Sequence, residues 1–184
     1  MTVHQCARFN ANPMSCHEES VKYIARYLLS SQDKGIHYKP DMTLVLECYV
    51  DADFAGGWSY SDHTNPECVL SRTGFVIMYA GCTLTRCSKL QTERALITTE
   101  SEYIDLSQAM REVILFMNLM VEVGEFFPLH NPKPEFHCKV FEDNNICIRV
   151  AESSKFTPRT KHTVIKYNHL RKHVADKTIS IFSN

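Results

Sequence analysis

Three segments with the two-residue period of β-strands stand directly before one long segment with helical periodicity, and this order restricts the fold more than any other feature. The strand-like segments are LVLECYVDADF (44–54), TGFVIMYA (73–80) and CTLTRCSK (82–89). A turn at Gly81 separates the last two, so the three predict an antiparallel meander. Residues 98–123 then predict a long helix that ends near Gly124 and Pro128.

The rest of the chain adds strand–helix units. EFHCKVFED (135–143) predicts a fourth strand, followed directly by a helix over 144–152. VIKYNHLRKHVAD (164–176) predicts a further helix, and TISIF (178–182) the last strand. This order predicts an α/β fold with a mixed five-stranded sheet flanked by helices.

A short helical segment precedes the strands. SCHEESVKYIARYLLSS (15–31) predicts a helix with Ser15 as N-cap and Glu18 three residues later, as in a capping box. Its apolar side chains recur at helical spacing: Val21, Ile24, Ala25, Leu28 and Leu29. The sequence therefore predicts a helical region over 1–40 and a larger domain over 41–184.

Composition narrows the class of protein. The chain has 184 residues, of which 44% are hydrophobic and 22% charged, as in a folded globular protein. The net charge of −1 gives no overall signature of nucleic-acid binding. Any such contact needs a local basic patch, or cations that bridge acidic side chains to phosphate.

The cysteines and the N-terminus indicate a reducing compartment. None of the eight cysteines has the two-residue spacing of a zinc knuckle. The beginning MTVHQCARFN lacks the apolar stretch of a signal peptide, and no run approaches the ~18 apolar residues of a membrane span. We therefore expect reduced, mostly buried thiols and a cytoplasmic or nuclear location.

Acidic residues end the first strand. Asp51 and Asp53 lie two residues apart, so both project to one face of the sheet. A carboxylate among Leu, Val, Cys and Tyr side chains needs a partner, because its desolvation is costly. Asp53 fits equally well as a turn cap or as the partner of a nearby Lys or Arg.

The long helix carries two acids in its first turn, and only one falls on the apolar face. Glu102 lies in line with Leu106, Ala109, Val113, Met117 and Met120, whereas Glu100 lines up with Ser107, Gln108, Arg111 and Asn118. A favourable position near the helix N-terminus explains Glu100 well and Glu102 poorly.

A third acid, Asp143, ends the fourth strand. It fits a helix N-cap, but parallel pairing of this strand with the first would place it beside Asp51. Three converging carboxylates repel one another unless cations neutralise them, and oxygen ligands favour Mg²⁺ or Mn²⁺.

Five linked motifs carry a family resemblance. YVDADFAGG (49–57), SRTGFVIMYAG (71–81), SKLQTERALITTESEY (88–103), FEDNN (141–145) and PRTKHTVIKYNHLR (158–171) resemble, in order and spacing, the ribonuclease H (RNase H) domain of copia-type retrotransposons. The likeness covers most of residues 44–182. HQCARFNANP and the helix after it resemble the reverse transcriptase connection that precedes this domain.

The resemblance implies a function and a set of site residues. It implies an RNase H-like fold that uses Mg²⁺ or Mn²⁺ to hydrolyse the RNA strand of RNA–DNA hybrids, with Asp51, Glu102 and Asp143 as metal-binding catalytic acids. It also implies hybrid contacts from seven residues: Ser71, Arg72, Gln91, Asn144, Arg159, Lys161 and His162. Of these, the last three form the one compact basic cluster.

One part of the family pattern has no match. The family's fourth acid belongs to an Ala-Asp-x-x-Thr-Lys type motif after the last strand, whereas this sequence reaches Asn184 without it. Asp176 reads as a turn residue, and Val164 stands where relatives are often acidic. We therefore expect weak cleavage. The alternative is a decayed or domesticated transposon product, without catalysis, that binds nucleic acid or another protein.

Overall fold

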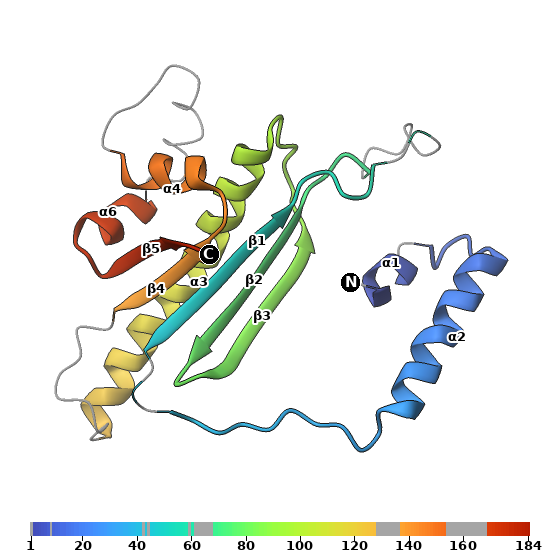
Figure 1. The fold of residues 1–184 in the computed structure, drawn as a ribbon, viewed down its shortest axis with the longest axis horizontal. Helices are drawn as coiled ribbons and strands as arrows, with labels where there is room; N and C mark the ends of the chain where they lie inside the picture. Colours follow the sequence, from blue (N-terminus) through green and yellow to red (C-terminus); the bar gives the residue numbers. More distant parts are fainter. Residues whose placement is uncertain are drawn as a thin grey trace. The chain divides into compact units, whose positions relative to one another are not determined.

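The five predicted strands form one sheet, in a computed structural model that describes residues 2–7, 9–41, 43, 45–58, 60, 68–127, 137–153 and 169–184. The strands are β1 (Leu46–Asp53), β2 (Arg72–Tyr79), β3 (Cys82–Leu90), β4 (Cys138–Glu142) and β5 (Ile179–Ser183), in the spatial order β3-β2-β1-β4-β5 (Figure 1). β1, β2 and β3 pair antiparallel, whereas β4 pairs parallel with both β1 and β5. The mixed five-stranded sheet that the sequence predicted is confirmed.

A two-residue turn joins β2 and β3. Ala80 and Gly81 both have positive φ, 51° and 72°, as the tightest hairpin turns require. The predicted turn at Gly81 is therefore present, and it sets the register in which Tyr79 pairs with Cys82. A similar left-handed residue, Lys177 at φ 57°, precedes β5.

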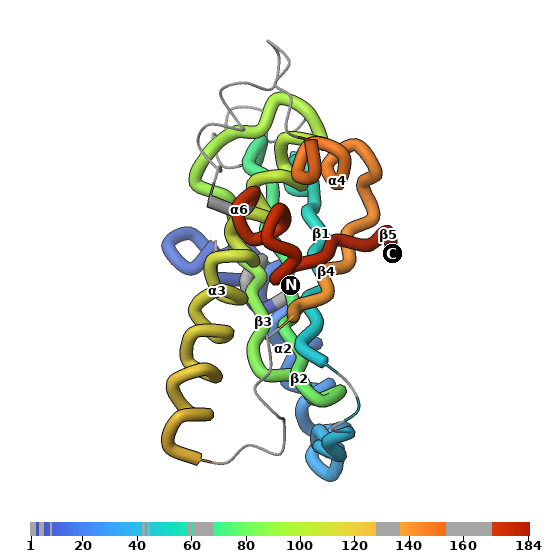
Figure 2. Tube along the Cα trace, turned by 90° about the vertical axis from the view of Figure 1, so that its left-hand side faces the viewer, coloured from blue at the N-terminus to red at the C-terminus, as the bar shows by residue number. Residues whose placement is uncertain are grey.

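Helices flank the sheet. The long helix α3 (Thr98–Phe126) packs on β1 and β2, and α4 (Asn145–Glu152) contacts β4, β5 and α6 (His169–Ala175). The tube in Figure 2 shows α3 running along the strands and continuing beyond them. The layer between α3 and the sheet is the core, and its largest fully buried apolar side chains include Leu46, Ile77, Tyr103, Leu106 and Met110.

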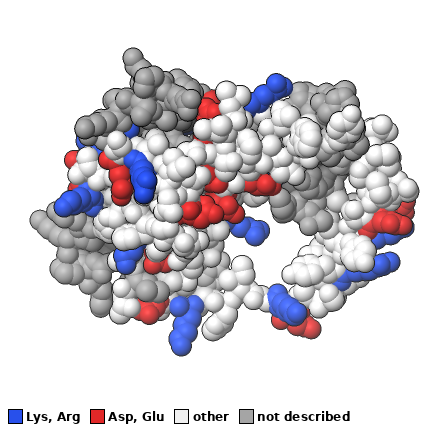
Figure 3. Space-filling view, turned by 45° about the horizontal axis from the view of Figure 1, so that its top comes forward, with Lys and Arg blue, Asp and Glu red and all other residues white. Residues whose placement is uncertain are grey.

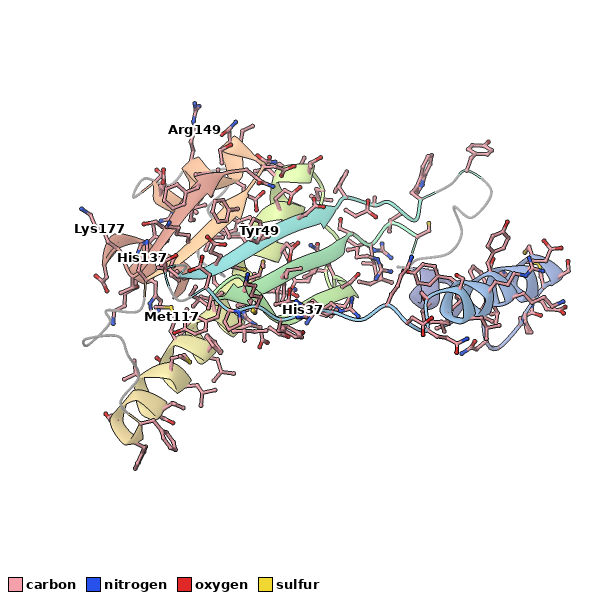
Figure 4. The ribbon with its side chains drawn as sticks, turned by 60° about the horizontal axis from the view of Figure 1, so that its bottom comes forward. His37, Tyr49, Met117, His137, Arg149 and Lys177 are labelled. Atoms are coloured by element: carbon pink, nitrogen blue, oxygen red, sulfur yellow. The ribbon has the colours of Figure 1, made fainter. Side chains whose placement is uncertain are left out.

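Alternation along β1 separates the two faces of the sheet. Leu46, Cys48, Val50 and Ala52 are buried towards α3, while the intervening side chains of β1 are exposed or half-buried. Tyr49 marks the second face in Figure 4, and its ring stacks on Phe141 of β4 with centroids 4.8 Å apart. The odd-numbered side chains of β1, Asp51 among them, therefore lie on the less covered face.

Several helix ends differ from the sequence predictions. α3 continues through Gly124 to Phe126, because one glycine inside a helix costs only ~1 kcal/mol and does not stop it. Ser107, which the helical phase placed in line with Glu100 and off the apolar face, is fully buried. Of the helix predicted over 164–176, only the part from His169 lies within the described residues.

The chain divides into two compact units, Met1–Tyr38 and Lys39–Asn184. The first holds α1 (Thr2–Ala7) and α2 (Ser15–Ser30), which contact each other. Ser15 is not the N-cap of α2. Met14 takes that position, its N–H donates to His17 Nδ1 at 3.0 Å, and Glu18 pairs instead with Lys22 at 2.6 Å.

All eight cysteines are free thiols in this structure. Four of them, Cys48, Cys68, Cys138 and Cys147, are fully buried. Burial raises the pKa of Cys138 to about 12 and moves the pKa of Cys48 well above its ordinary value. These two thiols belong to the core and are poor nucleophiles.

Candidate metal centre

Three carboxylates from three elements meet at the ends of β1 and β4. The parallel pairing of β1 with β4 ends at Tyr49 and Phe141, and Asp51 and Asp143 follow these two partners by two residues each. Glu102 reaches the same point from the first turns of α3. Asp51, Glu102 and Asp143 each offer one carboxylate oxygen, and these oxygens all lie within 4.8 Å of one another. The group contains neither Asp53 nor Glu100.

Glu102 is the buried member of the group. Its side chain is 5% exposed, and its Oε2 accepts the N–H of Ala52 at 3.0 Å. Burial raises the pKa of Glu102 to about 7, and the nearby Asp143 and Asp51 act in the same direction against that hydrogen bond. A cation at this point would reverse the effect, because it stabilises the charged carboxylate.

Glu100 has a local role instead. Its carboxylate accepts the N–H of Leu96 at 2.8 Å, just before the helix begins. The helical phase that separated Glu102 from Glu100 in the sequence therefore corresponds to two different environments. Glu102 is buried against β1, and Glu100 binds the backbone at the helix start.

Two more buried carboxyls lie behind this group, and the sequence reasoning assigned neither. Asp105 and Glu142 are both 0% exposed, and burial raises the pKa of each to about 8. Asp105 accepts the N–H of Gly74 at 2.9 Å, and Glu142 accepts the N–H of Asn144 at 3.1 Å. Periodicity could have found both: Asp105 follows Glu102 by three residues, and Glu142 continues the buried series of Cys138 and Val140.

Asn144 forms the helix cap that one interpretation gave to Asp143. Its Oδ1 accepts the N–H groups of Ile146 and Cys147, at 3.0 and 3.1 Å. Asp143 is consequently free of that task and remains exposed beside Asp51. The same bonds occupy Oδ1 of Asn144, one of the seven residues for which the resemblance implied a contact with the hybrid.

Three of the predicted hybrid contacts are buried side chains. Ser71 is 0% exposed and its Oγ accepts the N–H of Ala55 at 3.3 Å. Gln91 is 1% exposed and donates to the Ser101 carbonyl at 3.0 Å, while Arg72 is 7% exposed. Ser71 thus bonds the chain just after β1 and Gln91 bonds the start of α3, and none of the three side chains lies on the surface.

The predicted basic cluster of Arg159, Lys161 and His162 lies outside the described residues, as does Val164. Within the described residues, a shallow hollow adjoins the acids. It is lined by Tyr49, Asp51, Gly74, Val76, Arg86 and Asn184. Arg86 of β3 thus places a cation near Asp51, although the sequence reasoning did not select it. Figure 3 shows acidic side chains close together on one face of the molecule.

The chain has sequence relatives among the polyproteins of plant transposons. It is 31% identical over 175 residues to the retrovirus-related Pol polyprotein from transposon TNT 1-94 of Nicotiana tabacum, and 26% identical over 179 residues to that of transposon RE2 of Arabidopsis thaliana. These alignments cover 95% and 97% of this chain. Homologues of the chain over almost its whole length are therefore retrovirus-related Pol polyproteins from plant transposons. It spans about 12% and 11% of the length of these two relatives.

The fold has a match among solved structures. An RNase H1 isolated from compost by a metagenomic approach aligns with a TM-score of 0.51 at 17% identity, over 76% of this chain and 84% of that one. The chain therefore has the RNase H-like fold that the motifs predicted, and its sequence relatives are Pol polyproteins of transposons. No family model matches it. Among the described helices, none has both the length and the apolar character needed to cross a bilayer.

Proposed function

We propose that this domain is a divalent-cation-dependent nuclease that hydrolyses the RNA strand of RNA–DNA hybrids. The convergence of Asp51, Glu102 and Asp143 within 4.8 Å carries this proposal. The fold and the Pol polyprotein relatives support the class of enzyme. The resemblance stated above supports the three residues one by one.

The donor set fits a small hard cation. All three groups offer carboxylate oxygens, which Mg²⁺ and Mn²⁺ prefer over nitrogen or sulfur ligands. No thiol or imidazole belongs to the group. Burial has raised the pKa of Glu102 to about 7, so without a cation this side chain is partly protonated near neutral pH. We propose that Mg²⁺ or Mn²⁺ binds there and takes the place of that proton.

The three carboxylates would place the cation where the scissile phosphate of the substrate can reach it. Asp51, Glu102 and Asp143 would hold such a cation, which would supply activation of the attacking water and stabilisation of the leaving 3′ oxygen. Asp51 and Asp143 present their carboxylates to solvent, where a scissile phosphate can approach. The Ala52 N–H donates to Oε2 of Glu102, so the orientation of this carboxylate is set before substrate binds.

Contacts to the hybrid are proposed at two places. Arg86 lines the same hollow as Asp51, and its guanidinium would bind a phosphate of the hybrid there. The basic cluster of Arg159, Lys161 and His162 would supply a second phosphate contact. Ser71, Arg72, Gln91 and Asn144 would act indirectly, by holding the strand ends in place. Residues 1–40 would belong to the reverse transcriptase connection, and 41–184 to the nuclease.

Cleavage of a labelled RNA–DNA hybrid tests the proposal. Purified chain should cut the RNA strand weakly with Mg²⁺ or Mn²⁺, and Asp51→Asn should reduce the rate at least ~100-fold because an inner ligand of the cation is lost. Asp53→Asn is the matched control, since Asp53 lies two residues further on the same strand and outside the group. It should retain the wild-type rate.

The same experiment distinguishes a nuclease from the alternative, a domain that binds nucleic acid without cleaving it. A folded protein that binds the hybrid with Arg86-dependent affinity but does not cut it would contradict the nuclease and favour a binding module. Equal rates for wild type, Asp51→Asn and Asp53→Asn would show that cleavage comes from a contaminant.

A further inference from the structure

We infer that Asp105 is a positioning residue for the metal centre: through the Gly74 amide it fixes the β1 backbone at Asp51. The inference rests on the proposed function above, because it assigns a supporting role at the same site. Asp105 is absent from the residues that the resemblance implied, and it does not belong to the group of three carboxylates.

The first support is the burial and bonding of Asp105. The side chain is 0% exposed, yet only one of its oxygens has a hydrogen-bond partner among the described residues, the Gly74 N–H at 2.9 Å. Burying a carboxyl away from solvent is unfavourable, so the interaction that Asp105 makes must compensate for its desolvation. Its one bond crosses from the helix layer to the second strand of the sheet.

The second support is the position of Gly74. Gly74 pairs with Asp51 in the antiparallel ladder of β1 and β2. A Cβ at residue 74 would lie 2.8 Å from the Asp51 carbonyl oxygen, closer than side chains are found to approach. The two backbones are therefore in direct contact at the residue that carries the first acid. Glycine is required there, and a shift of Gly74 would move Asp51.

The third support is the arrangement of the other buried carboxyls. Glu102 accepts the N–H of Ala52, the residue after Asp51, and Glu142 accepts the N–H of Asn144, the residue after Asp143. Each buried carboxyl thus binds a backbone amide beside an exposed aspartate or directly across from one. Asp105 extends this pattern to β2, the strand that pairs with β1 at Asp51.

Mn²⁺ affinity of the whole chain, measured by electron paramagnetic resonance, tests the inference. Asp105→Ala removes the acceptor, and affinity should fall about tenfold, as it does when a partner that orients a ligand is lost. Asp105→Asn keeps an oxygen for the Gly74 N–H, and its affinity should stay within about threefold of wild type. The Gly74 amide should exchange its hydrogen faster in Asp105→Ala than in Asp105→Asn.

Ile104→Val is the matched control. Ile104 neighbours Asp105 on α3 and is 3% exposed, so this variant loses core packing without touching Gly74. It should lower the melting temperature and leave Mn²⁺ affinity unchanged. Gly74→Ala provides a second route to the same site, and it should weaken Mn²⁺ binding in the same direction as Asp105→Ala.

Unchanged Mn²⁺ affinity in Asp105→Ala would overturn the inference. So would an equal loss in Asp105→Asn, because charge rather than the hydrogen bond would then be responsible. If wild type itself fails to bind Mn²⁺, the proposed function fails and the positioning role falls with it. Binding by wild type that Asp105→Ala leaves intact contradicts the positioning role alone.

Discussion

The carboxyls at the ends of β1 and β4 form two sets with opposite surroundings. The outer pair, Asp51 and Asp143, is exposed to solvent. The inner three, Glu102, Asp105 and Glu142, are at most 5% exposed and have pKa values raised to about 7, 8 and 8. Glu142 and Asp143 are adjacent in sequence yet belong to different sets, because successive side chains of a strand point to opposite faces.

Acids that would repel one another are tolerated here because the two sets are stabilised in different ways. The outer pair is solvated and needs little support. The inner three are stabilised mainly by protonation and by one backbone N–H each. A cation that binds the outer pair and Glu102 would change the balance of the inner set, and three predictions test this relation.

The largest expected effect concerns pH and stability without metal. The folded pKa values of Asp105 and Glu142 are about 8, above their ordinary values of 3.8 and 4.5, so the folded state binds more protons than the unfolded state between these limits. Stability is therefore highest below about pH 4 to 5 for these groups and falls as pH rises towards 8. Between pH 5 and pH 8 the melting temperature should fall by on the order of 10 °C.

Thermal unfolding in EDTA, followed by circular dichroism, measures this fall. Asp105→Asn and Glu142→Gln should each reduce its slope, because neither amide titrates. Glu152→Gln is the control, since Glu152 is exposed at the end of α4 and should leave the slope unchanged. A melting temperature that rises from pH 5 to pH 8 would contradict the protonated inner set.

The next effect is stabilisation by the cation. A ligand that binds only the folded state at 100 times its Kd adds ~2.7 kcal/mol, which corresponds to ~5–10 °C in a chain of this size. Mn²⁺ should therefore raise the melting temperature, more at pH 8 than at pH 6, because Glu102 with a pKa of about 7 must lose its proton. Asp143→Asn should remove most of the Mn²⁺ shift, and Asp53→Asn should keep it. An equal shift in melting temperature at both pH values would show that Glu102 does not bind the cation.

The smallest effect concerns the turn between the two sets. Asn144→Ala removes the acceptor of two helix N–H groups, which should cost ~1 kcal/mol of unfolding free energy, measured in urea. Asn145→Ala is the neighbouring control and should cost less than ~0.5 kcal/mol, since no cap depends on it. If Asn144 contacts the hybrid instead, its substitution would weaken hybrid binding without lowering stability.

The sequence could predict the parts of this molecule that follow from periodicity. The strands themselves, the place of Asp51 and Asp143 at strand ends and the inward phase of Glu102 each follow from the spacing of residues along one element. Interactions between layers were not accessible in this way. Burial of Ser71, Arg72 and Gln91 depends on contacts between segments far apart in the sequence, and the Asp105–Gly74 bond depends on the distance between helix and sheet.

Two predictions of local structure, at the start of α2 and at the end of α3, were wrong for a different reason. The cap of α2 at Met14 and the passage of α3 through Gly124 are decided by differences of about 1 kcal/mol, which neighbouring packing easily outweighs. The roles of the three acids remain a prediction that cleavage and Mn²⁺ binding test.

The parallel pairing of β1 with β4 has a consequence for how the chain reaches its native state. β2 and β3 are joined by two residues and can pair early, whereas Tyr49 and Phe141 are partners 92 residues apart. Closing such a long loop is slow, because its entropy is lost before the contacts form. Asp51 and Asp143 therefore meet only when the slowest pairing of the sheet is complete. Cation capture would then report the end of folding, and free Mn²⁺ should slow unfolding more than it accelerates folding.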